Sequence, residues 1–400
     1  MRKKIRKHLS TFIESPSTST ILLLGATVLG LALANSPLAD QYHHLLEEHI
    51  GFFTIEEWIN DVLMAIFFLL VGLEVKREIL FGELNTNSKR ILPGVAAAMG
   101  VVFPALIYYL IAGANPNYSH GWAIPTATDI AFALGIVTAL GSRVPMAMKV
   151  FLTALAVIDD LIAILIIAIF YTASIQWTYL VGALVIIGIL VYINKKNYAR
   201  PMSYIPLGIA LWFCVFQSGL HATMAGVILA MCIPGTAFIG KEEVSPMEDW
   251  EHALSKWVSL LIVPVFAFAN TGVSLMGFQV SDLTHPVVLG VALALVLGKQ
   301  IGIFGTVWLL VKTKIVPMPA QTRWIHVYGV SVVCGIGFTM SLFVTLLAFD
   351  SSQVDSINRA KAGVLLGSMV AAVIGYLILR FTKVTKGDSM LTCLLYTSDA

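Results

Sequence analysis

Charged residues are scarce in this chain. Only 12% of its 400 residues are Asp, Glu, Lys or Arg, whereas 58% are hydrophobic and the mean hydropathy is +0.86. Soluble globular chains carry about 25% charged residues, so the composition excludes a soluble protein. Long polar linkers are missing as well, and we therefore expect a single membrane domain over residues 1–383, with no nucleic-acid partner.

Cysteine is also rare. The four cysteines are scattered, and Cys214, Cys232 and Cys334 lie in apolar runs without the short spacings of metal ligands. We interpret them as small buried side chains. The sequence therefore predicts neither a disulfide nor a resident metal cluster, and we expect no cofactor.

Apolar runs long enough to cross a bilayer recur along the chain. Because about 20 apolar residues span the hydrocarbon core as a helix, the pattern predicts an all-α polytopic membrane protein with about twelve transmembrane helices. The expected spans are residues 13–34, 58–80, 91–112, 121–140, 147–171, 177–194, 203–217, 220–234, 256–273, 287–311, 326–349 and 359–381. The seventh and eighth are short, so ten or eleven spans are the alternative if one of them is re-entrant.

Basic residues gather on one side of this twelve-span arrangement. Every Lys and Arg falls there except Lys299, inside a span, and Arg359 and Lys361. Since cytoplasmic loops collect Lys and Arg, we expect both termini in the cytoplasm. Residues 387–400 are unlike the rest of the chain, and we assign them no function.

Two groups of three spans, at about 91–171 and 287–381, are inverted with respect to each other, because an odd number of crossings separates their starts. The middle span of each group contains residues that weaken a helix, at 123–129 (AIPTATD) and at 334–339 (CGIGFT). Paired broken, crossing helices in inverted repeats indicate a substrate site near the bilayer midplane. The sequence therefore predicts a transporter.

Four ionisable residues lie deep in apolar runs: Asp129, Asp159, Asp160 and Lys299. Each such charge costs at least ~2.5–3.5 kcal/mol, and one lysine cannot neutralise three carboxylates, so protons or a bound cation must contribute. The structural alternative is an Asp159–Lys299 ion pair that only fixes helix packing. Neighbouring residues of a helix point about 100° apart, so we expect Asp159 and Asp160 to have different roles. A carboxylate that holds either a proton or a hard cation is sufficient for antiport.

Five motifs, in order, resemble the NhaA sodium/proton antiporters of bacterial inner membranes. They are FFLLVGLEVKREI at 67–79, GWAIPTATDIAFALG, ALAVIDDL, SGLHATMAG around His221 and LGKQIGI around Lys299, and the resemblance runs from about residue 10 to 383. It implies a secondary transporter, not an enzyme, that exchanges cytoplasmic Na⁺ or Li⁺ for external protons. It also implies that the exchange is electrogenic, activated at alkaline pH, and serves sodium and pH homeostasis.

The resemblance further implies roles for individual residues. Asp160 would be the principal Na⁺ ligand and proton carrier, with Asp159 beside it, either sharing the ion or paired with Lys299. Thr128 and Asp129 would lie where the broken helices cross, and Lys299 would offset helix dipoles or exchange a proton.

The family's pH response is implied to map to a cytoplasmic cluster, for which interfacial solvated charges are the alternative interpretation. Its members here are Glu74, Arg77, Glu78, Glu251 and His252. His221 is a further candidate, or else a satisfied core histidine. The loop near 41–55 resembles the family's outer β-hairpin, and this resemblance implies a homodimer.

Other functions share some of these features. An intramembrane aspartyl protease needs two buried aspartates on facing helices, whereas these two are adjacent. A retinal protein would use a mid-span lysine such as Lys299 with aspartate counter-ions, but twelve spans argue against it. A related cation/proton antiporter for K⁺ or Ca²⁺ stays an alternative.

Overall fold

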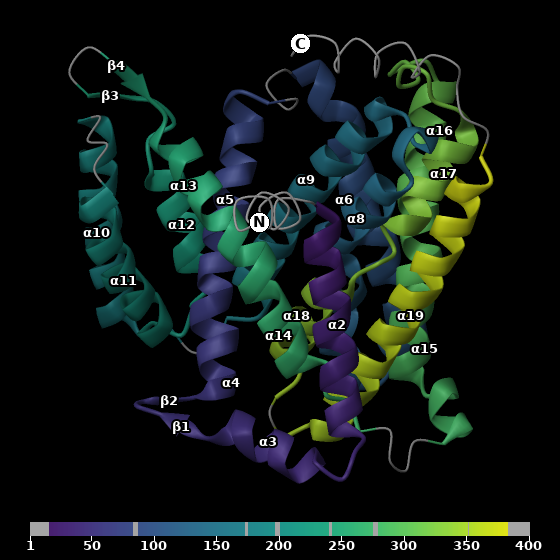
Figure 1. The fold of residues 1–400 in the computed structure, drawn as a ribbon, viewed down its shortest axis with the longest axis horizontal. Helices are drawn as coiled ribbons and strands as arrows, with labels where there is room; N and C mark the ends of the chain where they lie inside the picture. The colour runs from purple at the N-terminus through teal and green to yellow at the C-terminus, as the bar shows by residue number, and fades with distance from the viewer. Residues whose placement is uncertain are drawn as a thin grey trace, which may run out of the picture. The chain divides into compact units, whose positions relative to one another are not determined.

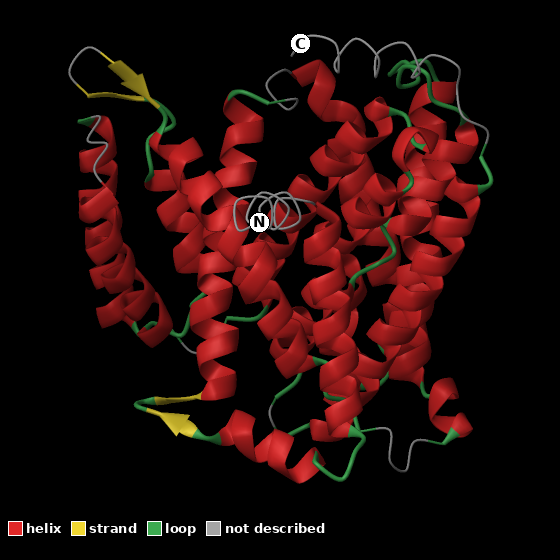
Figure 2. Ribbon diagram, in the orientation of Figure 1, coloured by secondary structure: helices red, strands yellow, loops and turns green. Residues whose placement is uncertain are grey.

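The computed structural model describes residues 16–82, 87–172, 175–196, 201–239, 242–274, 279–350 and 352–382. Helices make up most of these residues, and the strands in them form two short antiparallel hairpins (Figure 2). The basic N-terminal residues and the segment 387–400 lie outside the described residues.

The helices group into two compact units, each described here by itself. Unit 1 comprises Met1–Asn85, Asp160–Phe278 and Leu346–Asp350, and unit 2 comprises Thr86–Asp159, Gln279–Thr345 and Ser351–Ala400. The boundary crosses helix α9 (Met146–Phe170) between Asp159 and Asp160. This grouping does not decide the expectation of one domain over 1–383, which stays a prediction.

Unit 1 holds the N-terminal helices and the middle of the chain (Figure 1). Its described elements, besides the second part of α9, are α2 (Pro16–Ala34), α3 (Ala39–Glu47), β1 (His49–Ile50), β2 (Phe53–Thr54), α4 (Ile55–Glu57), η1 (Trp58–Leu63), α5 (Met64–Leu80), α10 (Trp177–Lys195), α11 (Pro201–Gln217), α12 (Met224–Cys232), β3 (Ala237–Ile239), β4 (Glu242–Val244), α13 (Pro246–Trp257), η4 (Val258–Ile262) and α14 (Val263–Asn270). Helix α5 packs against α12 and α13, and α2 packs against α14.

Small residues bring α5 and α12 into backbone contact. A Cβ added at Gly226 would lie 2.1 Å from the carbonyl oxygen of Ala65, and one added at Gly72 would lie 2.7 Å from the Cβ of Ala230. Close approach through glycine is a common way for membrane helices to associate, because lipid supplies no hydrophobic driving force between them. Helix α12 is thus held tightly although it has only nine residues.

The C-terminal end of α12 is capped by side chains. Lys76 Nζ donates hydrogen bonds to the carbonyl oxygens of Met231, at 2.8 Å, and of Ile233. Asn194 Nδ2 donates to the carbonyl oxygen of Cys232 at 2.7 Å. These bonds satisfy carbonyl groups that have no partner within a helix.

Unit 2 holds the two interrupted spans. Its described elements, besides the first part of α9, are α6 (Asn87–Ala112), α7 (Pro116–Ser119), η2 (His120–Thr126), α8 (Ile130–Ala139), η3 (Gly141–Arg143), η5 (Val280–Thr284), α15 (Pro286–Leu293), η6 (Ala294–Gly298), η7 (Gln300–Phe304), α16 (Gly305–Lys312), α17 (Trp324–Val333), α19 (Val354–Arg380) and α18 (Phe338–Ala348), whose residues from Leu346 on belong to unit 1. Helix α19 packs against α15 and α17, and α6 packs against α15 and both η6 and η7.

The membrane architecture agrees with the sequence. In the described part, eight helices are long and apolar enough to cross a membrane, or up to ten if each of two bent pairs is one span. Each of the twelve expected ranges overlaps a described helix, and the all-α polytopic class with broken helices is confirmed. The lower count arises partly because α11 and α12 are shorter than a full span.

Candidate functional site

The two interrupted spans of unit 2 break at the expected residues. In the first, the tight helix η2 contains Pro125, residues 127–129 are not helical, and α8 begins at Ile130. In the second, α17 ends at Val333, α18 begins at Phe338, and the two are bent by 43°. Proline and glycine end regular helical hydrogen bonding at both places.

The two breaks lie against each other within unit 2. The backbone N–H of Asp129 donates to the carbonyl oxygen of Ile336 at 2.7 Å, and Thr128 Oγ1 donates to the carbonyl oxygen of Cys334 at 3.0 Å. Backbone groups released by each break are therefore satisfied by the other.

Glycine makes this contact close. A Cβ added at Gly337 would lie 3.1 Å from the carbonyl oxygen of Ala127 in the first break, which is tighter than ordinary van der Waals contact. One added at Gly335 would lie 2.6 Å from the carbonyl oxygen of Leu295, so there is no room for a methyl group at this position.

One buried carboxylate caps two helices. Asp129 is 1% exposed. Its Oδ1 accepts from the backbone N–H of Phe132 at 3.1 Å, in the first turn of α8. Its Oδ2 accepts from the backbone N–H and the hydroxyl of Thr339, at 3.0 and 2.5 Å, in the first turn of α18. A negative charge here faces the partial positive charges of two helix N-termini.

Lys299 and Asp159 form a fully buried ion pair in unit 2. Lys299 Nζ lies 2.7 Å from Asp159 Oδ2, and both side chains are 0% exposed. Nζ also donates to the carbonyl oxygen of Thr126, at the end of η2. The other carboxylate oxygen of Asp159, Oδ1, is buried and accepts no hydrogen bond. The structure thus pairs the two residues and leaves one acceptor atom of Asp159 open.

The backbone around Lys299 is unusual. Lys299 lies between two π-helical segments, η6 and η7. Such wide turns are rare and occur frequently at functional sites. Glycines on both sides hold the segment against α6, since a Cβ at Gly298 would lie 2.6 Å from Pro104 Cα and one at Gly302 would lie 2.3 Å from the carbonyl oxygen of Met99.

Asp160 follows Asp159 on the same helix, α9, and is 2% exposed. It belongs to the chain segment of unit 1, whereas Asp159 belongs to unit 2. In the described part of the chain, no group of three or more His, Cys, Asp or Glu side chains is arranged to hold a metal ion. A small cation at these residues would therefore need hydroxyl or backbone oxygens in addition to carboxylates.

The residues expected to form a pH-responsive cluster all lie in unit 1, but they are not all in contact. Arg77 Nη1 lies 3.1 Å from Glu251 Oε1, and Arg77 Nη2 lies 3.4 Å from Glu78 Oε1. Glu251 is buried, and its Oε2 accepts no hydrogen bond. Glu74 is half-buried and lies within electrostatic reach of Glu251.

The two histidines lie differently. His252 is exposed beside Glu251, on whose carboxylate its charge acts. The side chain of His221 lies in the irregular segment before α12 and makes no hydrogen bond or ion pair with any described residue. The structure therefore brings Arg77, Glu78 and Glu251 together and leaves His221 apart.

Two polar residues of the site were missed in the sequence. Thr339 binds Asp129, and Ser368 Oγ accepts from the backbone N–H of Phe338 at 3.1 Å, so both complete the start of α18. Thr339 had a signal, because a hydroxyl residue directly after a Gly-containing break is suited to a helix start. Ser368 had none, because its partner is 30 residues away.

Interrupted membrane spans that meet at a buried carboxylate, next to a buried lysine–aspartate pair, define the class of secondary transporters. The family model described as Na+/H+ antiporter 1 matches residues 10–379. The chain belongs to this family, which confirms the resemblance seen in its motifs.

Two curated relatives agree with the family model. The chain is 52% identical to the Na(+)/H(+) antiporter NhaA of Nitrobacter hamburgensis over 94% of this chain and 92% of the relative. It is 49% identical to the protein of the same name from Caulobacter vibrioides, over 96% and 93%. A solved structure, that of the sodium proton antiporter MjNhaP1 from Methanocaldococcus jannaschii, covers 89% of both chains at 16% identity with a TM-score of 0.47.

Proposed function

We propose that this member of the Na⁺/H⁺ antiporter family exchanges cytoplasmic Na⁺ or Li⁺ for external protons across a bacterial inner membrane, with both termini in the cytoplasm. The observation that carries the proposal is the buried Asp159–Asp160 pair on α9, beside a lysine that neutralises Asp159. A buried carboxylate is stable when a proton or a cation neutralises it, and the two exclude each other.

In this mechanism Asp160 is the principal carrier of Na⁺ and protons. Asp159 is engaged by Lys299 through Oδ2, but its free Oδ1 is a candidate second ligand. Asp129 and Thr128 support the site from the broken spans, where Asp129 offsets two helix N-termini and so leaves its own charge compensated. An ion bound at Asp159 would compete with Lys299 for the same carboxylate. The positive charge of Lys299 would then move away from Asp159 or be lost as a released proton.

Net charge movement follows if more protons enter than Na⁺ ions leave. Such exchange would be electrogenic and driven by the membrane potential, which supplies about 2.3 kcal/mol per charge at 100 mV. The protein would then expel sodium and acidify an alkaline cytoplasm, and this role in sodium and pH homeostasis is part of the proposal.

Activation at alkaline pH is assigned to the cluster Arg77, Glu78 and Glu251, with Glu74, His252 and His221 as further members. The support is geometric: one guanidinium joins a carboxylate of its own helix to a buried carboxylate of α13, and Glu251 Oε2 has no hydrogen-bond partner. A change in protonation there would alter how α5 and α13 are held together.

A homodimer through the outer hairpin is also proposed. Strands β1 and β2 form an antiparallel pair whose turn has Gly51 at φ +71° and Phe52 96% exposed. Ile50 is 58% exposed in the same hairpin. A protruding aromatic side chain of this kind is typical of an anchor that a second copy would bury.

Proton flux in inverted membrane vesicles tests the exchange. We expect Na⁺ and Li⁺ to release protons from acidified vesicles, with responses that rise from pH 6 to 9, and K⁺ and Ca²⁺ to have little effect. Asp160→Asn should abolish the response, whereas Asp249→Asn, at an exposed position of α13, should not. Flux that persists in Asp160→Asn would overturn the assignment of the carrier, and a dominant K⁺ or Ca²⁺ response would overturn the ion selectivity.

The pH cluster is tested in the same vesicles. Glu251→Gln should displace the pH at which exchange becomes half-maximal, because it removes the charge that Arg77 faces. Asp249→Asn, an exposed change on the same helix, is the control. Identical pH profiles for the two variants would remove Glu251 from the pH response.

A further inference from the structure

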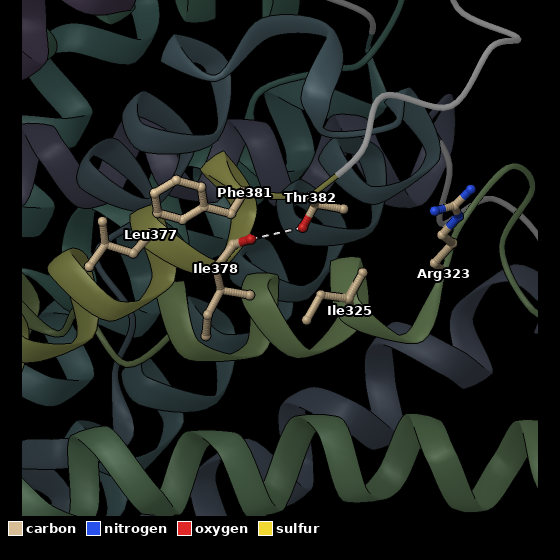
Figure 3. A pocket seen from close by; sticks show the side chains of 6 residues that line it. All are labelled: Arg323, Ile325, Leu377, Ile378, Phe381 and Thr382. Carbon is tan, nitrogen blue, oxygen red and sulfur yellow. Dashed lines mark hydrogen bonds between the residues drawn. The ribbon is translucent and has the colours of Figure 1, made fainter.

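A groove opens in unit 2 where α17 begins and α19 ends. Its lining is formed by Arg323, Ile325, Leu377, Ile378, Phe381 and Thr382, and its volume is about 820 Å³, including space open to the outside. Figure 3 shows the apolar side chains in a row, with Arg323 at one end of it. Thr382 Oγ1 is occupied by a hydrogen bond to the carbonyl oxygen of Ile378 at 2.8 Å.

The apolar part of the groove is open rather than packed. Phe381 is 81% exposed, Leu377 45% and Ile325 42%. These residues lie at the ends of α17 and α19, helices of membrane spans, and Trp324, 39% exposed, stands between Arg323 and Ile325. Tryptophan is enriched at the boundary between hydrocarbon and headgroups. The apolar row therefore faces the acyl-chain side of this boundary.

Charge of one sign lines the groove. The segments 323–325 and 377–382, from which all its lining residues come, contain Arg323 and Arg380 and no Asp or Glu. Arg143 lies beside them, because its Nη1 donates to the carbonyl oxygen of Arg380 at 2.7 Å. Arg323, by contrast, is exposed and forms no ion pair with any residue that the structure describes. Its guanidinium is the cation that an anionic ligand of the groove would meet.

We propose that this groove binds one acidic phospholipid, with the phosphate on Arg323 and an acyl chain along Ile325, Leu377 and Phe381. Guanidinium groups bind phosphate through two parallel hydrogen bonds. A soluble phosphate would leave the apolar row uncovered, and a neutral headgroup would leave the basic surroundings without a counter-charge. Basic pockets between membrane helices have this preference for anionic headgroups.

Native mass spectrometry of the purified full-length chain tests this site. The protein in detergent is titrated with dioleoyl phosphatidylglycerol, with dioleoyl phosphatidylcholine, and with glycerol 3-phosphate as the soluble phosphate. We expect the phosphatidylglycerol to bind most tightly, and Arg323→Gln to weaken its first binding step about fivefold, the loss expected for one basic residue near an anionic surface. Phe381→Ser should weaken the binding of both lipids.

The matched control is Lys314→Asn, which removes one positive charge from the same exposed loop at a φ of 60° that asparagine tolerates. It should leave the first binding step within twofold of the unchanged protein. Equal losses in Arg323→Gln and Lys314→Asn would overturn the site, because they would indicate attraction by net charge alone. Equal binding of the two lipids, or displacement of the lipid by an equal concentration of glycerol 3-phosphate, would overturn the ligand. Melting curves without lipid establish that the variants are folded.

Discussion

Replacing Lys299 by methionine tests how much the buried ion pair contributes to the free energy of unfolding. Methionine keeps most of the side-chain volume but leaves Asp159 with an uncompensated charge in a site that is 0% exposed. Breaking a buried pair in this way costs about 3–5 kcal/mol. With an entropy of unfolding of about 0.8 kcal/mol/K for a chain of 400 residues, the melting temperature should fall by roughly 4–6 °C.

The assay is a thermal melt of the purified protein in detergent, followed by intrinsic fluorescence. Lys312→Met is the matched control: it makes the same substitution on the same span, at an exposed position over Trp308, and should cost less than about 1 kcal/mol. The double variant Lys299→Met/Asp159→Asn removes both charges and should recover part of the loss. Recovery should be incomplete, because the bond from Lys299 to the carbonyl oxygen of Thr126 is absent in both variants.

Two results would refute this reasoning. If Lys299→Met melts within about 1 °C of the unchanged protein, the pair does not stabilise the fold. If the double variant is no more stable than the single one, the loss does not come from the stranded charge of Asp159, and the coupling expected of a contacting pair is missing.

Three further predictions concern caps and protonation. Asp129→Ala removes the carboxylate from two helix starts and should cost about 2 kcal/mol, at about 1 kcal/mol per cap, while Thr339→Ala should cost about half as much in the same melts. Lys76→Met exposes carbonyl groups at the end of α12 and should accelerate hydrogen exchange there, with α14 unchanged. For His285, which precedes α15, burial and then the positive charge of Arg359, 3.0 Å away, lower the pKa below its usual 6.5. The fold therefore favours neutral His285, whose contribution to the free energy of unfolding is fully present above pH 6.5 and is lost as the pH falls. The melting temperature should drop more between pH 7.5 and 5.5 in the unchanged protein than in His285→Gln.

Membrane architecture and break positions could be predicted from the sequence because both depend on local patterns. Apolar runs fix where helices cross, and residues such as Pro125 and Gly335 fix where they break. The depth of a lone Lys299 among apolar residues was enough to suggest a buried partner, and the structure shows Asp159 in that place.

Other features depend on contacts between distant residues and had no local signal. That Asp129 would bind the start of α18 follows from the contact between the two breaks, in which the backbone N–H of Asp129 donates to the carbonyl oxygen of Ile336. Thr339 indicates only that a helix begins there, and no local pattern names its partner. The resemblance of motifs grouped His221 with the charged cluster. A shared motif does not say how far His221 lies from the other members. The π-helical turns beside Lys299 were also hidden, because ALVLG and QIGIF are equally compatible with a regular α-helix.

The two π-helical segments beside Lys299 make the geometry of the span Pro286–Lys312 depend on how many residues it contains. Each wide turn closes a hydrogen bond over five residues instead of four, so this span holds more residues than a regular α-helix of the same height. Removing one residue from 294–298 would let that turn close as α-helix, because the wide turn has absorbed an extra residue. Removing one residue from the regular helix Pro286–Leu293 would instead rotate Lys299 by about 100° relative to the residues before the deletion. Lys299 could then no longer face Asp159 while the residues before it stayed in place. The position of the lysine is thus set by the number of residues in the span as much as by their identity.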